Sequence, residues 1–342
     1  MTTATAGPGR GRPTLEDVAA YARVSRATVS RVINRSPKVS PDARDAVEHA
    51  IRALGYVPNP AARTLVTQRT DAVALVMSEP DTRVFSDPFF GDIVRGVSQE
   101  LQKEGQQLVL VMVQTDDDHE RFERYVQGGH VDGVLLVSLH GADPLPVSLA
   151  RAGVPTVLGG RSLGPGADLP YVDVDNHGGA QSAVRHLVQA GRRQIATVAG
   201  PQDMCAGVDR LSGYWSALER GRHRRSLVEI GDFTQDSGVA AMTALLERHP
   251  DLDAVFAASD LMALGALQAL RNAGRRAPDD VAVVGFDDHV LARYSDPPLT
   301  TVRQPTVRMG QEMARMLSRR RTGEAAPPPV VLETELVVRS SG

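Results

Sequence analysis

The segment RATVSRVINRSPKVS, residues 26–40, combines three arginines and a lysine with apolar residues at helical spacing. Val29 and Val32 can anchor one face of a short helix, which leaves the guanidinium groups of Arg26 and Arg31 on the other face. A guanidinium group pairs bidentately with guanine, and an α-helix fits the major groove of B-DNA. An ordinary solvated helix carries arginines as well, so the neighbouring sequence must distinguish the two interpretations.

Polar residues also accumulate directly after several apolar runs in the later part of the chain. Carboxylates and an arginine can hydrogen-bond the hydroxyl groups of a sugar, and an aromatic ring can serve as its platform. Such residues occur in the stretches FSDPFF (85–90), GPQDMCAGVDR (200–210), GDFT (231–234), SDLMALGA (259–266) and GFDDH (285–289). If the apolar runs are parallel strands, these polar ends meet at one edge of a sheet, where such folds bind ligands.

The length and composition are those of a folded protein with two domains, or with one large domain and a small appendage. The chain has 342 residues and 42% hydrophobic side chains, enough for a sizeable core. Its one cysteine, Cys205, excludes an intrachain disulfide framework and fits a reducing cytoplasm. The sequence shows neither the apolar core of a signal peptide nor a run of membrane-spanning length, so we expect a cytoplasmic protein.

The net charge of −3 conceals an asymmetry between the two parts of the chain. Residues 1–70 contain eleven Lys and Arg against five Asp and Glu, a balance of +6. The remainder contains 27 against 36, a balance of −9. A basic N-terminal part on an acidic body indicates a polyanionic partner.

The N-terminal part is predicted to form three short helices. Thr14 and Ser25 are suitable N-caps for two helices in TLEDVAAYARVSRATVSRVIN (14–34), and Ser40 followed by Pro41 begins a third. Apolar residues at helical spacing on all three can close one small core. Two helices joined by a tight turn and followed by a third form a helix-turn-helix head. Its second helix presents outward Arg26, Ala27, Thr28, Ser30 and Arg31.

From Asp71 onward, apolar runs alternate with helical segments. The runs predict buried parallel strands at 72–78, 107–113, 132–138, 155–160, 171–175, 194–200, 227–232, 253–259 and 281–288. Helices are expected near 90–104, 118–128, 144–152, 176–190, 208–221, 237–248 and 260–273. The fold class is therefore α/β, with an all-α head and a body of two subdomains whose parallel sheets face each other across a cleft. The strand order stays open, and we expect the chain to cross between the subdomains near 160, 290 and 323.

The N-terminal part of the chain resembles the head and hinge of the lactose-repressor (LacI/GalR) family of transcription regulators. The resemblance lies in TLEDVAAYARVSRATVSRVIN and in the following VSPDARDAVEHAIRALGYVPNPAARTL. The body resembles the periplasmic-binding-protein-like fold of that family. The resemblance implies a homodimer that binds a palindromic double-stranded operator and a small-molecule sugar effector. It divides the chain into a disordered tail at 1–13, a helix-turn-helix DNA-binding domain at 14–58, a hinge helix and linker at 59–70, and an effector-binding and dimerisation domain at 71–342.

In that family, the second helix reads bases and the hinge enters the minor groove. The segment NPAARTL (59–65) is too short for a stable helix in water, so it is expected to become ordered on DNA. Leu65 matches the leucine that the family inserts between base steps, which bends the duplex. The resemblance assigns contacts with bases or phosphates to Arg26, Ala27, Thr28, Ser30, Arg31, Asn34, Ala62 and Leu65.

By family position, Arg210 and Asp287 are the strongest candidates for a clamp on sugar hydroxyl groups. Phe233 would supply a platform, and Ser259 stands where many members have asparagine. The two glycines at 159–160 lie near a position where several members carry an aspartate, so more room and less charge are expected there. The effector-binding candidates are Asp87, Phe89, Phe90, Arg210, Phe233, Ser259, Asp287 and Gln304.

Short stretches favour a subgroup within the family. DGVLLVSLHG (132–141), LPYVDVDN (169–176) and GPQDMCAGVDRLSGY (200–214) are similar to actinobacterial regulators that respond to cellobiose-type glucosides. Two other functions stay open: a regulator corepressed by a purine, which needs a flat aromatic slot, and a sugar-binding module without DNA function. No phosphate-binding or nucleophile motif occurs, and TDDDHE (115–120) is interpreted as a helix start. We therefore expect no enzyme, no metal and no cofactor.

Overall fold

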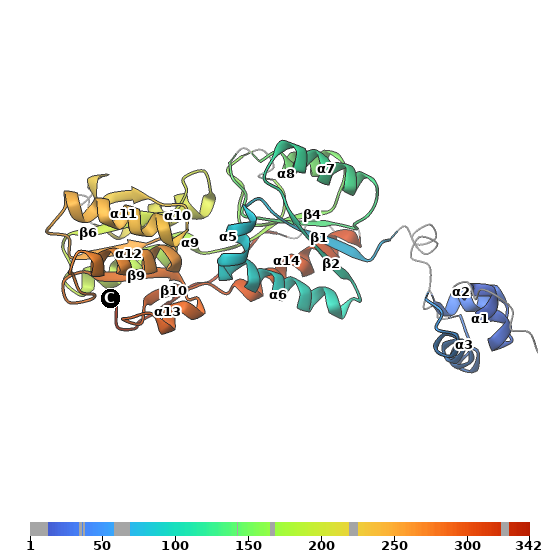
Figure 1. Cartoon of the computed structure of the whole chain (residues 1–342). Coiled ribbons are helices and arrows are strands. Elements are labelled where there is room, and N and C mark those ends of the chain that lie inside the picture. The colour runs from blue at the N-terminus through green and yellow to red at the C-terminus, as the bar shows by residue number, and fades with distance from the viewer. Residues whose placement is uncertain are drawn as a thin grey trace, which may run out of the picture. The chain divides into compact units, whose positions relative to one another are not determined.

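The computed structural model describes residues 13–33, 36, 38–57, 69–141, 143–164, 168–218, 225–322 and 328–342. The chain divides into two compact units, Met1–Thr70 and Asp71–Gly342, called the head and the body below (Figure 1). None of the helices in the described part of the chain is both long and apolar enough to cross a membrane.

The head consists of three helices that enclose a small apolar core. They are α1 (Leu15–Ala22), α2 (Arg26–Ile33) and α3 (Pro41–Leu54). Thr14 caps α1 through reciprocal hydrogen bonds with Asp17, and Ser40 caps α3 immediately before Pro41. Buried at the centre are Val18, Ala19, Val29, Val32, Val47 and Ala50. The predicted helix-turn-helix head is confirmed.

The body contains two subdomains, each built on a six-stranded sheet. In the first subdomain all paired strands are parallel, and their order is β11-β5-β4-β3-β1-β2. These strands are β1 (Ala72–Met77), β2 (Gln107–Met112), β3 (Val134–Val137), β4 (Thr156–Gly159), β5 (Tyr171–Val174) and β11 (Val330–Leu332). Helices α6 (Pro88–Lys103) and α14 (Thr306–Arg321) cover one face of the sheet. Helices α7 (Asp116–Gln127) and α8 (Leu145–Arg151) cover the other, and the short helix α5 (Asp81–Ser86) precedes α6.

The second subdomain has the strand order β12-β10-β9-β8-β6-β7. Its strands are β6 (Ile195–Ala199), β7 (Val228–Ile230), β8 (Ala254–Ala257), β9 (Ala282–Asp287), β10 (Thr300–Arg303) and β12 (Glu335–Val337). Helices α11 (Gln235–Arg248) and α12 (Asp260–Asn272) pack on one face. Helices α9 (Asn176–Gln189) and α10 (Cys205–Ala217) pack on the other, and α13 (Val290–Tyr294) follows β9.

The two parallel sheets confirm the predicted fold class, but the last third of the chain differs from the prediction. Strand β12 is antiparallel to β10. The chain crosses between the subdomains after β5, between β10 and α14, and between β11 and β12. The predicted crossings near 160, 290 and 323 are therefore too early, because β5 still follows 160 in the first subdomain and β10 still follows 290 in the second. The sequence did not reveal β10, β11, β12 or α14, since these strands have only three or four residues and α14 mixes Met and Arg.

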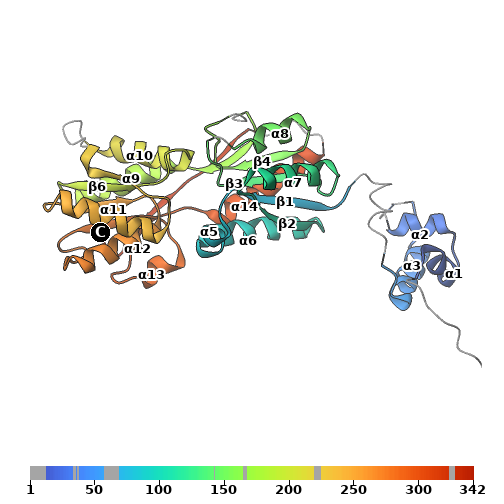
Figure 2. The same cartoon turned by 45° about the horizontal axis from the view of Figure 1, so that its top comes forward.

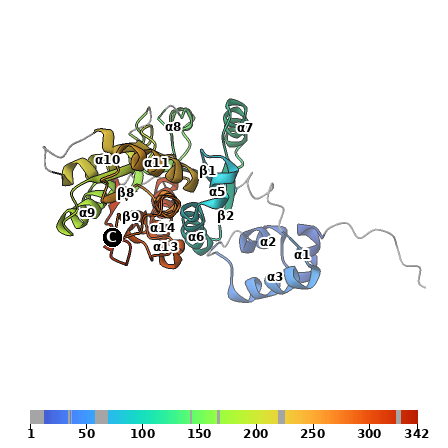
Figure 3. The same ribbon diagram turned by 60° about the vertical axis from the view of Figure 1, so that its left-hand side comes forward.

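Helix α14 belongs to the first subdomain because it packs closely against α6, as Figure 2 and Figure 3 show. Glycines at the contact permit this approach. A Cβ at Gly96 would lie 2.0 Å from the carbonyl oxygen of Val307, and one at Gly310 would lie 2.5 Å from that of Ile93. Backbone meets backbone at this point, so neither helix can yield to a larger side chain without moving.

We predict that Gly96→Ala destabilises the body by about 1–3 kcal/mol, because the added methyl group forces α6 and α14 apart. Gly91 on α6 provides a matched control, since a Cβ at that position would meet nothing within 4 Å. Gly91→Ala should be neutral or slightly stabilising, because alanine is the better helix former. Urea unfolding of both variants measures the difference. Equal free energies of unfolding would contradict the close helix contact.

Candidate functional site

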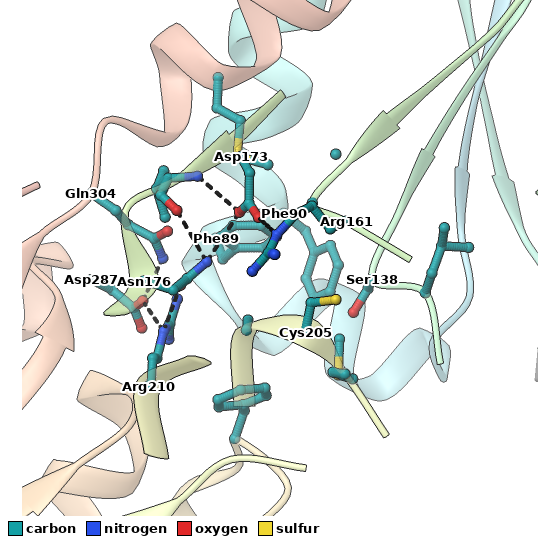
Figure 4. A pocket seen from close by; sticks show the side chains of 18 of the residues that line it. Phe89, Phe90, Ser138, Arg161, Asp173, Asn176, Cys205, Arg210, Asp287 and Gln304 are labelled. Carbon is teal, nitrogen blue, oxygen red and sulfur yellow. Dashed lines mark hydrogen bonds and ion pairs between the residues drawn. The ribbon is translucent and has the colours of Figure 1, made fainter. Parts of the chain in front are cut away.

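A pocket lies between the two subdomains of the body, at the carboxyl ends of their strands (Figure 4). The first subdomain contributes residues that follow β1, β3 and β4 or end β5, and the second contributes residues at the ends of β6, β7, β9 and β10. Of the predicted effector residues, those that line it are Asp87, Phe89, Phe90, Arg210, Phe233, Asp287 and Gln304. Ser259 does not line it: the Ser259 hydroxyl accepts a hydrogen bond from the backbone N–H of Met262 and caps α12.

Arg210 on α10 carries a guanidinium group that is almost fully buried in the wall of the pocket. Its Nε donates a hydrogen bond to Oδ1 of Asn176 at 2.9 Å, and its Nη1 donates to the carbonyl oxygen of Ala258 at 2.6 Å. Nη1 also lies 3.7 Å from Oδ1 of Asp287, and the guanidinium carbon lies 3.8 Å from the centroid of the Phe286 ring. Burial lowers the pKa of Arg210, and the charge of Asp287 opposes that effect. Together these contacts fix the orientation of the guanidinium group.

Asp287 ends β9 in a backbone conformation that aspartate rarely adopts, with a φ of 127°. Nε2 of Gln304 donates a hydrogen bond to Oδ1 of Asp287 at 2.5 Å. Ser138 and Phe233 line the same pocket and also have positive φ angles, of 59° and 68°. Such strained residues persist where the surrounding structure fixes them, and they cluster at functional sites. The backbone of these three residues therefore supports a functional role for the pocket.

A buried cluster of ionisable groups surrounds His289, which no sequence argument singled out. Its Nε2 lies 3.4 Å from Oδ1 of Asp87 and 3.4 Å from Oδ2 of Asp287. Its backbone N–H donates a hydrogen bond to Asp260 at 2.8 Å. Burial alone would lower the pKa of His289, but the carboxylates of Asp287 and Asp87 raise it to about 11. Burial and the charge of Asp287 raise the pKa of Asp260.

Arg161 follows β4 and connects the two subdomains. Its guanidinium group forms an ion pair with Asp209 on α10, and its Nε donates a hydrogen bond to Oδ2 of Asp173 at 3.3 Å. Nδ2 of Asn176 donates to the other oxygen of Asp173 at 3.0 Å. Burial raises the pKa of Asp173, whereas the charge of Arg161 lowers it. Figure 4 shows this chain of polar contacts running from Arg210 through Asn176 and Asp173 to Arg161.

His140, which follows β3, makes a further contact between the subdomains. Its Nδ1 lies 2.7 Å from Oδ2 of Asp203 in the β6–α10 loop, and its Nε2 lies 3.4 Å from Oε1 of the buried Glu79. The carboxylates of Glu79 and Asp203 raise the pKa of His140 to about 9, although partial burial acts in the opposite direction. The imidazole is therefore charged at neutral pH and pairs with a carboxylate of each subdomain.

The sequence prediction missed several residues of the pocket. Asp173 and Asn176 lie in the stretch LPYVDVDN, at the end of a predicted strand, so their position could have identified them. Arg83 could not be identified in this way, because its helix α5 was not predicted. The expected space near the two glycines is present at Gly160, where a Cβ would meet nothing within 4 Å, but not at Gly159, where a Cβ would lie 2.6 Å from the Val137 side chain. Other lining residues that the prediction did not name are Ser138, Arg161, Met204, Cys205 and Met309.

In the head, α2 presents three of the predicted base-reading residues to solvent, namely Arg26, Ala27 and Arg31. Thr28 and Ser30 are half-buried beside them. Nη1 of Arg26 lies 3.1 Å from Oε1 of Glu16, and both side chains are mostly exposed. An exposed ion pair contributes about 0–1 kcal/mol, so Arg26 can exchange this partner for another at little cost.

Three of the predicted DNA-binding residues, Asn34, Ala62 and Leu65, lie outside the described residues. The same holds for residues 1–12 of the predicted tail and residues 59–68 of the predicted hinge. Their roles stay predictions.

Comparison with known proteins identifies the family. Residues 14–59 match the family model for bacterial regulatory proteins of the lacI family, and residues 184–342 match a periplasmic binding protein-like domain. The chain is 58% identical over 337 residues to the HTH-type transcriptional regulator CelR of Thermobifida fusca, with 97% of this chain and 99% of CelR covered. The chain belongs to the LacI family. It is accordingly a DNA-binding transcriptional regulator and not an enzyme.

Two solved structures of LacI-family regulators have a similar fold. One is a complex of the transcriptional regulator CelR with cellobiose, which is 56% identical and has a TM-score of 0.78, with 97% of this chain and 100% of that chain covered. The other is the lac repressor dimer bound to operator and the anti-inducer ONPF, which is 29% identical and has a TM-score of 0.84, with 97% and 99% covered. The match of the head to the lacI family model argues against a sugar-binding module without DNA function.

The His140 contact predicts a stability that depends on pH. Because its pKa is raised in the folded protein, its charge stabilises the fold fully below about pH 6.5, and this contribution disappears as the pH rises through about 9. The melting temperature of the wild type should therefore exceed that of His140→Gln at pH 6, and the difference should shrink toward pH 9.5. Thermal unfolding in matched buffers measures it. A difference that stays constant over this range would contradict the charged contact.

Proposed function

We propose that this protein is a cytoplasmic repressor of carbohydrate-utilisation genes. It binds a palindromic operator as a homodimer and is released by a neutral sugar of the cellobiose type. The observation that carries the proposal is the pocket in which Arg210 and Asp287 meet polar residues of the other subdomain. The similarity to CelR, whose solved structure is a complex with cellobiose, supports the ligand class. The similarity to the operator-bound lac repressor dimer supports operator DNA and a second copy of the chain as partners.

The charges in the pocket favour a neutral ligand. Its three guanidinium groups are each paired with a carboxylate: Arg83 with Glu79, Arg161 with Asp209, and Arg210 with Asp287. A phosphorylated sugar needs a cationic group that is free to pair with its phosphate. Hydroxyl groups can instead accept from a guanidinium group and donate to a carboxylate while the ion pair between them persists. A sugar without phosphate therefore fits this set of side chains.

A purine, the other effector class considered, fits less well. A purine base needs a flat slot between aromatic or apolar faces. The rings of Phe89 and Phe90 meet edge to face, with 5.3 Å between centroids and 84° between planes. The Phe233 ring is approached by the guanidinium groups of Arg83 and Arg210, at 5.4 and 5.7 Å from its centroid. A single ring beside charged donors suits a pyranose, which has an apolar face and a polar edge.

The division of the body into two subdomains gives the sugar a way to act on DNA binding. A ligand that contacts both subdomains stabilises one arrangement of them over the others. In a dimer, that arrangement sets the spacing of the two hinge segments at 59–70. The hinges become ordered on the operator and insert Leu65 into the minor groove, and the sugar-bound arrangement spaces them unfavourably. The sugar thereby weakens operator binding without contacting the DNA.

The clamp residues provide a test of the effector site. Asp287→Asn keeps the shape of the side chain and removes its charge, and Arg210→Ala removes the guanidinium group. Both should abolish the response to sugar and leave operator binding close to wild type, because each unpaired buried group costs about 1–3 kcal/mol of ligand affinity. Calorimetry with cellobiose and an operator-binding assay measure the two properties. In cells, both variants should repress permanently.

The matched control is Asp279→Asn, because Asp279 is a mostly exposed carboxylate that pairs with Arg276. It should leave both properties unchanged. Undiminished sugar affinity in both clamp variants would refute the site. Binding of a purine in place of a sugar would refute the ligand class.

The second test concerns α2. On a palindrome selected from random duplexes, Arg31→Ala should cost about 1–3 kcal/mol and relax the preference for that sequence. Arg52→Ala removes the same charge from the exposed face of α3, where Arg52 lies near Glu48, and should preserve the preference. Binding to the selected and a scrambled duplex at two salt concentrations separates sequence reading from charge. If wild type and Arg31→Ala show the same ratio of the two affinities, α2 does not read the operator through Arg31.

A further inference from the structure

His289 occupies a distinctive position behind the pocket. It is 4% exposed, and its Nε2 is buried without a hydrogen bond to any described residue. At 3.4 Å from Asp87 and from Asp287, this nitrogen is outside good hydrogen-bond distance of both carboxylates. Its interaction with them is therefore chiefly electrostatic, and their oxygens keep the capacity to accept hydrogen bonds from a ligand.

The two carboxylates near His289 belong to different subdomains. Asp87 caps α6 in the first subdomain, where it accepts the backbone N–H of Phe89, and Asp287 ends β9 in the second. Both line the pocket, whereas His289 does not. Two carboxylates that face one cleft repel each other, and a cation between them offsets that repulsion. His289 lies where such a cation is required.

The charged groups that face His289 come from every neighbouring element. Asp87 lies at the start of α6, Asp287 at the end of β9, and Asp260 at the start of α12. Beyond them lies Arg210 on α10, whose Nη1 is 3.7 Å from Oδ1 of Asp287. The guanidinium group of Arg210 donates to Asn176 and to a backbone carbonyl and lies nearest to Asp287, so it acts more weakly on Asp87 than on the second subdomain's carboxylate.

We propose that His289 is a positioning residue of the effector site: its charged imidazole holds the carboxylates of Asp87 and Asp287 in place across the cleft, so that one ligand can engage both subdomains. This inference rests on the proposed sugar-binding function. The imidazole does not touch the ligand. It acts by offsetting the repulsion between the two carboxylates, and so makes the bridging arrangement available to a molecule with several hydroxyl groups.

The test is calorimetric titration of the full-length protein with cellobiose at about pH 6 and pH 8.5, for the wild type, His289→Gln and His289→Lys. His289 of the wild type stays charged at both pH values, because a group with a pKa of about 11 does not titrate between them. Asp260, whose pKa is raised to about 8, does titrate in this range, so each variant is compared with the wild type at the same pH. His289→Gln leaves the carboxylates without their cation. The affinity of His289→Gln should fall about 30-fold or more below that of the wild type at pH 8.5, and the loss should be smaller at pH 6, where Asp260 with its raised pKa carries less negative charge.

His289→Lys supplies a cation at the same position and should restore an affinity close to that of the wild type at both pH values. Equal affinities of the wild type and His289→Gln at both pH values would overturn the positioning role. An equal loss in both variants at both pH values would also overturn it, because shape and not charge would then be responsible. A wild type that binds no glucoside would refute the proposed function, and the inference with it. The titration of the wild type alone reveals this outcome, so it cannot be confused with a failure of the positioning role.

Discussion

A guanidinium group buried in a protein must have its charge and its donors satisfied, and Arg210 imposes this requirement on the body. Its partners come from three distant points of the chain: Asn176 at the start of α9, the carbonyl of Ala258 after β8, and Asp287 at the end of β9. They meet only when β8 and β9 are neighbours and α9 lies at the same edge of the sheet, as the strand order provides. The same contacts aim a guanidinium group and a carboxylate at the cleft, so the residue that organises the second subdomain also builds the ligand site.

The contacts between the two subdomains differ in kind from the contacts within each subdomain. Each of the four apolar clusters of the body lies within one subdomain. The contacts across the cleft are polar: Arg161 with Asp209, His140 with Asp203, and His289 with Asp87. Polar contacts of this kind can be exchanged for water or ligand at a small net cost, whereas an apolar core cannot be opened in this way. The cleft is consequently where the body can change its arrangement, and a ligand placed there can decide which arrangement prevails.

The parts that could be predicted from the sequence are those with a local signal. The caps at Thr14 and Ser40, the small core of the head and the long buried strands follow from residue types and spacing alone. The subdomain to which helix α14 belongs could not be predicted, because it depends on a contact between Gly96 and Val307, which are far apart in the chain. In the site, Arg210 and Asp287 were named from family resemblance, and the structure brings them together. His289 and Arg161 were missed because their importance lies in the subdomain they reach, which no local pattern reveals. Ser259 does not line the pocket, because a serine after a strand can also cap the following helix, so its role in effector binding stays a prediction.

In the proposed function, a sugar bound to the body and an operator bound to the head oppose each other through one equilibrium. Thermodynamic linkage makes this reciprocal: cellobiose must weaken operator binding by the same factor by which operator weakens cellobiose binding. The most direct measurement is the dissociation constant of cellobiose for the full-length protein, determined calorimetrically with and without saturating operator duplex. Cellobiose should bind more weakly in the presence of operator, by about 5–150-fold, the usual range of allosteric coupling. The same cellobiose affinity with and without operator would contradict this coupling.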